Sequence, residues 1–285
     1  MKTSLDCIPC FIRQTLDAAR LISTEPSEHK KIMREIISFI GNMDLDRPPP
    51  VLGQAIHRRI REITCVEDPY CEVKEYQNHM ALSLFPMLKA EIDASSDPLM
   101  TAVRLTIAGN ILSMTASGNV TESDVHNAIK QGLTEHSYMQ EAEFRRAIAE
   151  AETILYLADN AGEIIFDRLL IEQLLRARLT VAVRGSPIIN DATVKDAYAA
   201  GLSEFVEIIE NGSDAPGIIL EDCSQAFNRR FADADLIISK GQGNFETLNH
   251  GQRNIFFLFK VKCPVIATHV GMPVGTHILR QQSSG

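Results

Sequence analysis

Hydrophobic residues in the first half of the chain recur at helical spacing. After Asp68-Pro69, apolar side chains follow at steps of three and four residues, namely Val73, Tyr76, Met80, Leu84, Met87 and Leu88. This spacing lines one face of a helix. The same periodicity appears over residues 8–22, 28–41, 51–63 and 98–113, with clusters of proline, serine and aspartate between the stretches. We therefore predict an all-helical N-terminal domain over residues 1–150.

Beyond Glu150 the pattern changes to short apolar runs that alternate with helical stretches. The runs cover residues 154–158, 179–183, 205–209, 236–239 and 265–268. Strands that are hydrophobic almost throughout, with helices between them, are typical of a parallel sheet covered on both faces. Residues 151–285 are therefore predicted to form an α/β domain, a Rossmann-like fold with a doubly wound, mostly parallel sheet. No low-complexity linker separates the halves, so the boundary is soft.

Composition narrows the class of protein. Of the 285 residues, 45% are hydrophobic and 23% are charged, which is ordinary for a globular chain. The net charge of -9, without a block of consecutive lysines or arginines, argues against a nucleic-acid partner. The first residues do not resemble a secretory signal, and no apolar run approaches the roughly 20 residues that span a bilayer. We expect a cytoplasmic protein that does not bind membranes and whose six cysteines are mostly reduced.

Two predicted strands are followed by oxygen-rich loops. Asp159-Asn160-Ala161-Gly162-Glu163 follows the first strand, and Asp191 lies in the loop after the second. Taken alone, Asp159 is explained equally well as a helix N-cap, and Asp191 is explained better as one. Because ligands bind at the carboxyl ends of parallel strands, and adjacent strands lie roughly 5 Å apart, Asp159, Asn160 and Asp191 can also converge on one cation. Oxygen ligands favour Mg or Mn, and Co or Ni can occupy such a site.

The fourth predicted strand ends in a different kind of loop. Lys240-Gly241-Gln242-Gly243-Asn244 combines one positive charge with small residues whose backbone N–H groups can approach a ligand closely. An anion site and a structural tight turn are equally consistent with it. Lys260 and Lys262 precede the last predicted strand and are either surface lysines or further phosphate contacts.

Two pairs of residues in the helical half have open roles. Cys7 and Cys10 form a Cys-x-x-Cys pair that suits a soft metal or redox exchange, although four-coordinate zinc would require Cys71 or a histidine. Half-buried free thiols are the alternative. Lys74 and Asn78 are one helical turn apart and point together either toward a cleft or toward water.

Together, these loops resemble those of the damage-control phosphatase family, also known as DUF89. The matching stretches are Cys7–Cys10, Asp68–Tyr70 with Lys74 and Asn78, Ala108–Asn110, Asp159–Glu163, Arg184–Thr193, Asn211–Gly217, Ala234–Leu248 and Lys262–Ala267. They span nearly the whole chain, and the Cys-x-x-Cys pair is similar to the stand-alone prokaryotic branch. The family often has an aspartate where this chain has Ser113, which leaves the role of that carboxylate open.

The resemblance implies hydrolysis of phosphate monoesters with a divalent cation held by Asp159, Asn160 and Asp191. It also implies phosphate contacts from the loop Lys240–Asn244 and from a late lysine, for which Lys262 fits better than Lys260. Arg184 and Asn110, which belong to matching stretches, are assigned to substrate binding. Glu163 either orients a water or supports the ligands.

The functional hypothesis is a metal-dependent phosphatase for sugar phosphates or damaged phosphometabolites, in which Lys240 offsets charge on the phosphoryl group. Two alternatives are an S-adenosylmethionine-dependent carboxyl methyltransferase and a non-catalytic metal- or nucleotide-binding protein. The first is disfavoured because no glycine-rich loop follows the first strand with an acidic residue after the second. The physiological substrate, the native metal and the oligomeric state are not determined by the sequence.

Overall fold

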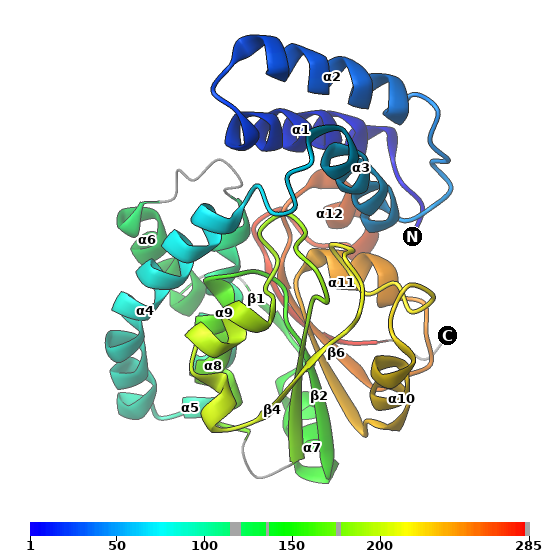
Figure 1. The fold of residues 1–285 in the computed structure, drawn as a ribbon. Coiled ribbons are helices and arrows are strands. Elements are labelled where there is room, and N and C mark those ends of the chain that lie inside the picture. Colours follow the sequence, from blue (N-terminus) through cyan, green and yellow to red (C-terminus); the bar gives the residue numbers. More distant parts are fainter. Residues whose placement is uncertain (115–120, 135–136, 175–177, 283–285) are drawn as a thin grey trace.

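The protein is built around one mixed sheet, which confirms the predicted fold class (Figure 1). The computed structural model describes residues 1–114, 121–134, 137–174 and 178–282. Within these residues the chain forms a seven-stranded sheet in the order β1-β7-β6-β5-β2-β3-β4. Its strands are β1 Ser137–Met139, β2 Thr153–Leu157, β3 Arg178–Val183, β4 Glu207–Glu210, β5 Leu236–Lys240, β6 Ile255–Lys260 and β7 His277–Gln281. β7 runs antiparallel to β6, and the other neighbouring pairs are parallel.

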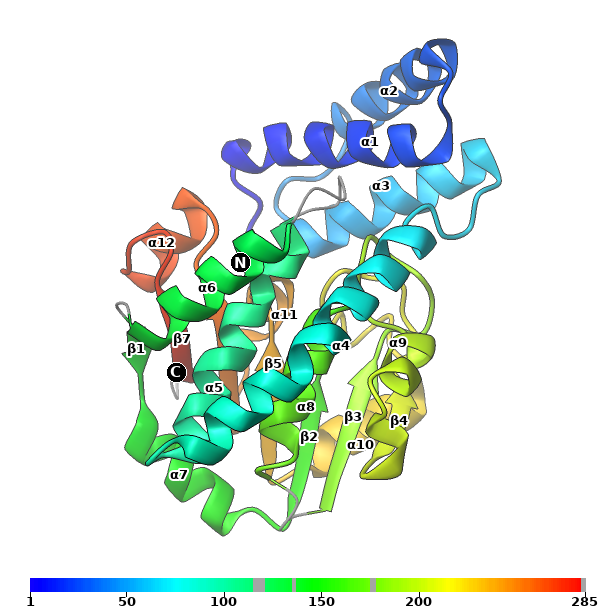
Figure 2. The ribbon, with the colours of Figure 1, turned by 90° about the vertical axis from the view of Figure 1, so that its left-hand side faces the viewer.

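Helices cover both faces of this sheet, and three further helices lie above it (Figure 2). They are α1 Ile8–Ile22, α2 Pro26–Ile40, α3 Pro49–Thr64, α4 Cys71–Ala94, α5 Pro98–Ala108, α6 Glu122–Thr134, α7 Glu141–Glu150, α8 Glu163–Ile171, α9 Val194–Ala199, α10 Gln225–Asp233, α11 Gln242–Leu248 and α12 Pro264–Val270. Figure 2 shows α4, α5 and α8 beside the sheet and α1, α2 and α3 above it. Among the described helices, none combines the length and the hydrophobicity that crossing a bilayer requires.

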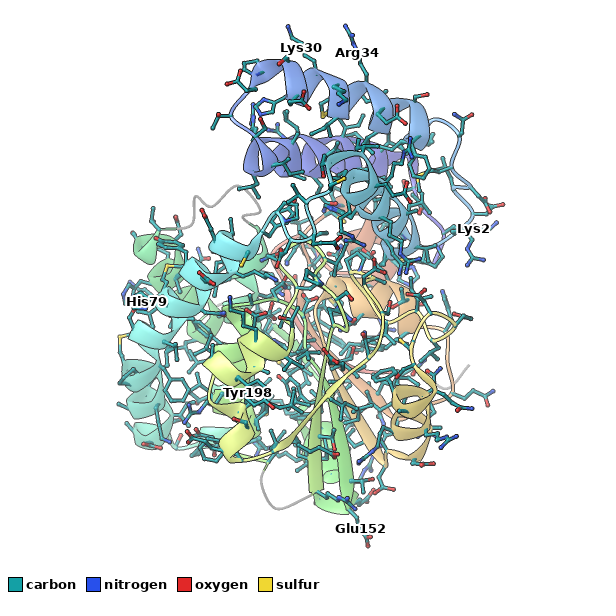
Figure 3. All side chains as sticks on the ribbon, viewed as in Figure 1. Lys2, Lys30, Arg34, His79, Glu152 and Tyr198 are labelled. Carbon is teal, nitrogen blue, oxygen red and sulfur yellow. The ribbon has the colours of Figure 1, made fainter. Side chains whose placement is uncertain are left out.

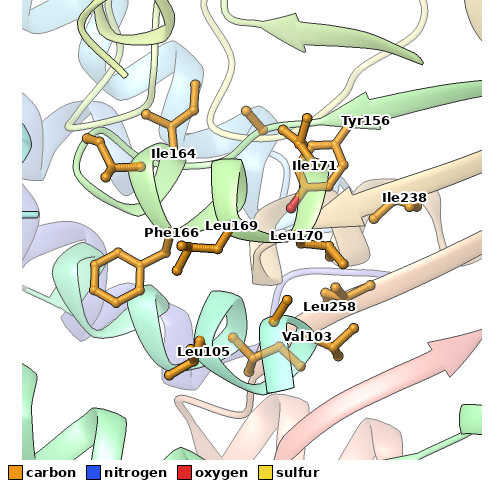
Figure 4. Close-up of a cluster of buried hydrophobic side chains, with 14 of the residues drawn as sticks. Val103, Leu105, Tyr156, Ile164, Phe166, Leu169, Leu170, Ile171, Ile238 and Leu258 are labelled. Atoms are coloured by element: carbon orange, nitrogen blue, oxygen red, sulfur yellow. The ribbon is translucent and has the colours of Figure 1, made fainter. Parts of the chain in front are cut away.

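Strand β2, in the interior of the sheet, shows how the two faces are filled. Ile154 and Tyr156 belong to the hydrophobic cluster with α4, α5 and α8, whereas Leu155 and Leu157 belong to the cluster with α10, α11 and α12. This division follows from the alternation of side chains along a strand. Figure 4 shows apolar side chains of α5 and α8 gathered against the strands in the first cluster.

The first three helices form a separate layer, which we call the cap (α1–α3). The cap has its own hydrophobic cluster, including Phe11, Ile36 and Ile56. On its outer side, Lys30 and Arg34 of α2 point away from the molecule (Figure 3). Helices α4 to α7, in contrast, contribute to the cluster under the sheet. The hydrophobic clusters therefore separate the cap from the remaining chain more sharply than they separate the two sides of residue 150.

Several sequence predictions about single elements were wrong. Residues 265–268 form part of helix α12 instead of a strand, because Pro264 begins the helix after the extended residue Cys263. The real strands in this part are β6 and β7, which were missed. The first half is not entirely helical either, since β1 pairs with β7 from the end of the chain. A three-residue strand has no detectable periodicity, and short apolar runs do not distinguish strands from helices.

Candidate functional site

The predicted loops meet where the order of the strands reverses. From β2 the chain passes to β3 and β4 on one side, and it returns through β5 to the other side of β2. Leu157 at the end of β2 lies opposite both Ala182 and Ser239, so the three loops begin at the same level. Asn160 and Asp191 form a β-bridge between two of them. Such a switch point is where open α/β sheets bind ligands.

Two amides face two carboxylates in the loop after β2. Asn160 Nδ2 donates to Asp159 Oδ2 at 2.6 Å and to Glu163 Oε2 at 2.9 Å. Asn110 Nδ2 donates to Glu163 Oε2 at 2.7 Å and to Asp159 Oδ2 at 3.4 Å. Because the amide nitrogen of Asn160 is turned toward the carboxylates, its Oδ1 is turned away from them. Asn160 Oδ1 is therefore oriented as a neutral oxygen ligand.

Arg184 connects the loops after β2, β3 and β5. This buried side chain donates from Nε to Asp191 Oδ2 at 2.7 Å and from Nη2 to Asn244 Oδ1 at 3.1 Å. Its Nη2 also lies 3.8 Å from Asp159 Oδ1. Asn244 in turn donates to the carbonyl oxygen of Lys240 at 2.8 Å. Both Arg184 and Asn244 thus hold protein groups in place around the site, and a substrate contact from either stays a prediction.

Ile189 shapes the turn that leads to Asp191. Its φ of 45° lies in the left-handed region, which a β-branched residue rarely adopts. The Ile189 side chain packs against the hydrophobic cluster of the cap. Backbone strain of this kind is retained where the surrounding structure stabilises it, and it is concentrated at functional sites. The cap therefore contributes to placing Asp191 in the site.

Lys240 is completely buried and fully hydrogen-bonded. Its Nζ donates to Glu163 Oε1 and to Asp167 Oδ1, both at 2.6 Å, and to the Thr106 carbonyl oxygen at 3.1 Å. The two carboxylates outweigh the effect of burial and raise the pKa of Lys240. The sequence had suggested a phosphate contact for this lysine, but the structure surrounds its ammonium group with protein acceptors.

The two glycines after Lys240 permit close approach. Gly241 has a φ of +79°, and a Cβ atom on it would lie 1.9 Å from Asp159 Oδ2. A Cβ atom on Gly243 would lie 2.2 Å from the carbonyl oxygen of Pro216. Any side chain at either position would displace the loops that form the site. Contacts from Gly241, Gln242 or Gly243 to a phosphate stay predictions.

Lys262 is the other lysine close to the carboxylates. The residue is half-buried after β6, and its backbone N–H donates to Gln242 Oε1 at 3.3 Å. Burial lowers the pKa of Lys262, whereas the charges of Asp159 and Asp191 act to raise it. Lys260 instead lies opposite His277 of β7. Of the two lysines, Lys262 is therefore the one within electrostatic range of the site.

Seven charged side chains, which we call the site cluster, are concentrated here. They are Asp159, Glu163, Asp167, Arg184, Asp191, Lys240 and Lys262. Within the described residues of this cluster, four carboxylates oppose three cations, so full ionisation leaves one net negative charge (3 − 4 = −1).

Within the site cluster, the pKa values of some carboxyl groups are raised and that of another is lowered. Burial, together with the charges of Glu163 and Asp191, raises the pKa of Asp159 to about 8. Burial also raises the pKa of Asp191, although Arg184 opposes the shift. Burial disfavours ionised Glu163 as well, but Lys240 and Lys262 outweigh it and lower the pKa of that carboxyl. Carboxylates with raised pKa values bind a proton or a cation favourably.

Residues outside the predicted loops complete the site. Asp167 and Thr106 were missed, although Asp167 follows Glu163 by four residues and so shares its helix face. Lys74 and Asn78 both point inward. Lys74 pairs with Asp68 at 2.6 Å, and Asn78 Oδ1 accepts from the Gly162 backbone N–H at 2.7 Å. The side chain of Ser113 lies outside the described residues.

The Cys-x-x-Cys pair lies away from this cluster, at the start of α1. Within the described residues the six cysteines are free, with Cys7 half-buried and Cys10 exposed. Burial raises the pKa of both thiols. Nor do three or more histidine, cysteine, aspartate or glutamate side chains of the described residues form a group that could hold a metal ion by themselves.

The topology and the buried polar residues define an open, doubly wound α/β protein with a candidate active site at the switch point. Residues 3–278 match the model of the damage-control phosphatase ARMT1-like domain. The chain belongs to this family, as the loop motifs had indicated. Family membership supports a phosphatase, and therefore a hydrolase, activity on damaged metabolites.

Similar proteins agree with this assignment. A damage-control phosphatase from Archaeoglobus fulgidus is 34% identical over 98% of this chain and 99% of its own length. Another from Pyrococcus horikoshii is 31% identical over 96% of each chain. The crystal structure of a DUF89 family protein from Pyrococcus horikoshii matches with a TM-score of 0.90 and 30% identity, covering 99% of this chain and 100% of that one. The fold seen here is thus the fold of that family member.

Proposed function

We propose that this protein is a divalent-metal-dependent phosphatase that hydrolyses small phosphate monoesters, such as sugar phosphates or damaged phosphometabolites. Its family supports the phosphatase activity. The observation that supports metal dependence is the uncompensated negative charge of the site cluster, expressed in the raised pKa of Asp159. A divalent cation bound there would more than offset this negative charge, and a purely structural cluster gains nothing from such an excess of carboxylates.

The donor set fits a hard cation. Asp159, Asn160 and Asp191 offer two carboxylates and one amide, and oxygen ligands suit Mn, Mg, Co or Ni. The amide is essential to this set, because the acidic side chains of the described residues do not by themselves form a metal-holding group. Asn160 already has its Nδ2 committed to Asp159 and Glu163. Its oxygen is therefore pre-oriented before a cation arrives.

The remaining residues bind and orient the reactants. A cation held by this set would polarise a phosphoryl oxygen and lower the pKa of a bound water. Lys262 is placed to offset negative charge on the phosphoryl group. Arg184 holds Asp191 in its ligand orientation. Glu163 has both oxygens engaged by protein donors, so we assign it to supporting the ligands instead of activating water.

Burial of the site restricts what can react there. Asp159, Asn160 and Asp191 are all buried beneath the cap. A buried site of this kind excludes bulk water, which strengthens electrostatic interactions with a bound phosphate. We therefore propose a small phosphorylated metabolite as the substrate, bound without any nucleic-acid or membrane partner.

The test is release of inorganic phosphate from an aryl phosphate and from a panel of sugar and cofactor phosphates. Metal-stripped protein would be assayed alone and with Mn, Mg, Co or Ni, next to the variants Asp159→Ala and Asp46→Ala. Asp46 is a matched control, because it is an exposed aspartate paired with Lys2 at the surface. We expect cation-dependent activity that Asp159→Ala reduces by about 10³-fold and Asp46→Ala leaves unchanged.

Other outcomes would select among the alternatives. Phosphate release that is equally fast without metal would contradict the cation requirement while leaving a phosphatase. Metal binding without phosphate release from any compound would favour a binding protein. Methyl transfer from S-adenosylmethionine to a carboxylate, with no phosphate release, would establish the methyltransferase.

A further inference from the structure

The ammonium group of Lys240 has no donor left for a ligand in the described structure. A lysine ammonium has three donors. Those of Lys240 reach the Glu163 carboxylate, the Asp167 carboxylate and the Thr106 carbonyl oxygen, all within 3.1 Å. The side chain is 0% exposed, as are those of Glu163 and Asp167. To contact a phosphate, Lys240 would have to break a buried ion pair, which is costly when one partner is left uncompensated.

A second layer of hydrogen bonds holds this lysine in place. Thr106 of α5 also donates from Oγ1 to Asp167 Oδ1 at 3.0 Å. Asp167 therefore accepts on a single oxygen from both Lys240 and Thr106. This places the lysine between α5 and α8, on the side of the sheet with the larger hydrophobic cluster, where its position is set by the core of the protein.

On its other side, Lys240 determines the position of the ligand amide. It occupies Glu163 Oε1, so Glu163 presents Oε2 to Asn160 and Asn110, which donate at 2.9 and 2.7 Å. An amide whose nitrogen points at this oxygen must present its own oxygen elsewhere. The hydrogen bonds thus lead from Asp167 through Lys240 and Glu163 to the orientation of Asn160.

We propose that Lys240, Asp167 and Thr106 are positioning residues that fix Glu163 and thereby turn Asn160 Oδ1 toward the metal, so that Lys240 itself does not contact the phosphate. This rests on the proposed function, since it assigns roles within the same site. Asp167 and Thr106 do not belong to the proposed ligand set. Partners that orient a metal ligand typically account for about 10- to 100-fold of metal affinity.

The test compares Lys240→Met with Lys262→Met in two binding titrations. The first titrates Mn²⁺ into metal-stripped protein, and the second titrates inorganic phosphate at saturating Mn²⁺. Each variant removes one positive charge near the carboxylates, so a purely electrostatic role predicts tighter Mn²⁺ binding in both. We expect this only for Lys262→Met. Lys240→Met should instead weaken Mn²⁺ binding by about 10-fold or more.

Phosphate binding should show the opposite pattern. Lys262→Met is expected to weaken phosphate affinity by about 10-fold, the effect of losing a charge-assisted hydrogen bond, whereas Lys240→Met should change it by less than about 3-fold. Lys195→Met is the matched control, because Lys195 is an exposed lysine paired with Glu75. It should alter neither affinity. Weaker phosphate binding with unchanged or tighter Mn²⁺ binding in Lys240→Met would overturn the proposal.

A second variant, which changes no charge, keeps the test decisive if Lys240→Met does not fold. Thr106→Val has nearly the same shape and removes the hydrogen bond to Asp167 without changing a charge. We expect its Mn²⁺ affinity to fall by roughly 5-fold and its phosphate affinity to stay the same. An unchanged Mn²⁺ affinity would show that Thr106 is not a positioning residue.

NMR of the lysine ammonium groups separates this inference from the proposed function. The experiment uses side-chain ¹⁵N labelling and diamagnetic Mg²⁺ in place of paramagnetic Mn²⁺, which would broaden signals near the site. The Lys240 signal should exchange slowly with water and keep its shift when phosphate is added, while the Lys262 signal moves. Wild-type protein that binds Mn²⁺ and phosphate in this way but hydrolyses no phosphate ester would refute the phosphatase and leave the inference intact. A Lys240 signal that moves with phosphate while the Lys262 signal does not would refute the inference, whatever the activity.

Discussion

Two groups of charged residues in this protein differ in the balance of positive and negative side chains. The first is the site cluster at the switch point. The second, which we call the clamp, joins α3 of the cap to the segment after β4 through Arg58, Arg61, Asp214 and Asp222. Arg58 Nη2 donates to Asp214 Oδ1 at 2.6 Å and to Asp222 Oδ1 at 3.1 Å, and Arg61 pairs with Asp214. Two cations meet two carboxylates in the clamp, whereas three meet four in the site cluster.

The difference appears in the acidity of the aspartates. In the clamp, burial is outweighed by the arginines and by hydrogen bonds, and the pKa values of Asp214 and Asp222 are lowered. In the site cluster the pKa of Asp159 rises to about 8. A balanced set of charges suits attachment of the cap, whereas an excess of carboxylates suits the cation binding that we propose for the site cluster. The comparison thus distinguishes structural from functional charge by local balance.

The largest expected effect comes from neutralising a proposed metal ligand. Asp191→Asn keeps the shape of the side chain and an acceptor for Arg184, but it removes a negative charge from the ligand set. Wild-type protein should gain about 2.7 kcal/mol of unfolding free energy when Mn²⁺ is present at 100 times its dissociation constant. Asp191→Asn should lose this gain and about 10³-fold in phosphate release. Chemical denaturation with and without Mn²⁺ measures the first effect, and an intact gain would remove Asp191 from the ligand set.

Breaking the ion pairs of the clamp should lower the free energy of unfolding more than it lowers the rate of phosphate release. Asp214→Ala leaves Arg58 and Arg61 without their shared carboxylate, and we expect unfolding free energy to fall by about 3 kcal/mol because paired charges become uncompensated. Denaturant titration monitored by circular dichroism gives the value. Asp46→Ala, which opens an exposed surface pair, should leave the free energy of unfolding unchanged within error. Equal losses in both variants would show that the clamp is no stronger than a surface pair.

Glu246 is another buried carboxyl group with a raised pKa, so its effect on stability should depend on pH. Burial raises its pKa from the ordinary 4.5 to about 7, so the folded protein binds this proton more tightly than the unfolded chain. The corresponding stability is present below about pH 4.5 and is lost as the pH rises through about 7. Glu246→Gln keeps an acceptor for Gln242 and should therefore be more stable than wild type at pH 8, by up to about 3 kcal/mol, with the difference vanishing near pH 4.5. Thermal unfolding across this range would show a constant difference if Glu246 does not titrate there.

Prediction from the sequence succeeded where local pattern and burial coincide. The strands β2, β3 and β5 have buried residues almost throughout, so their apolar runs were visible and their polar loops could be placed at the sheet edge. The prediction of a strand over residues 265–268 was wrong because Pro264 favours the start of a helix. β1 was missed because its pairing with β7 depends on residues 140 positions away, from Ser137 to His277.

The sequence by itself determined which residues can do chemistry in this protein: the loop motifs, the alternating α/β pattern and the family follow from residue order alone, because turn residues and hydrophobic runs act locally. Only the tertiary structure decided what each charged group touches. Lys240 is enclosed because α5 and α8 bring Thr106 and Asp167 against it, and Lys262, just before α12, lies within electrostatic range of the carboxylates. Contacts between residues far apart in the chain depend on how complete elements pack, and burial then sets both the strength of each pair and its pKa.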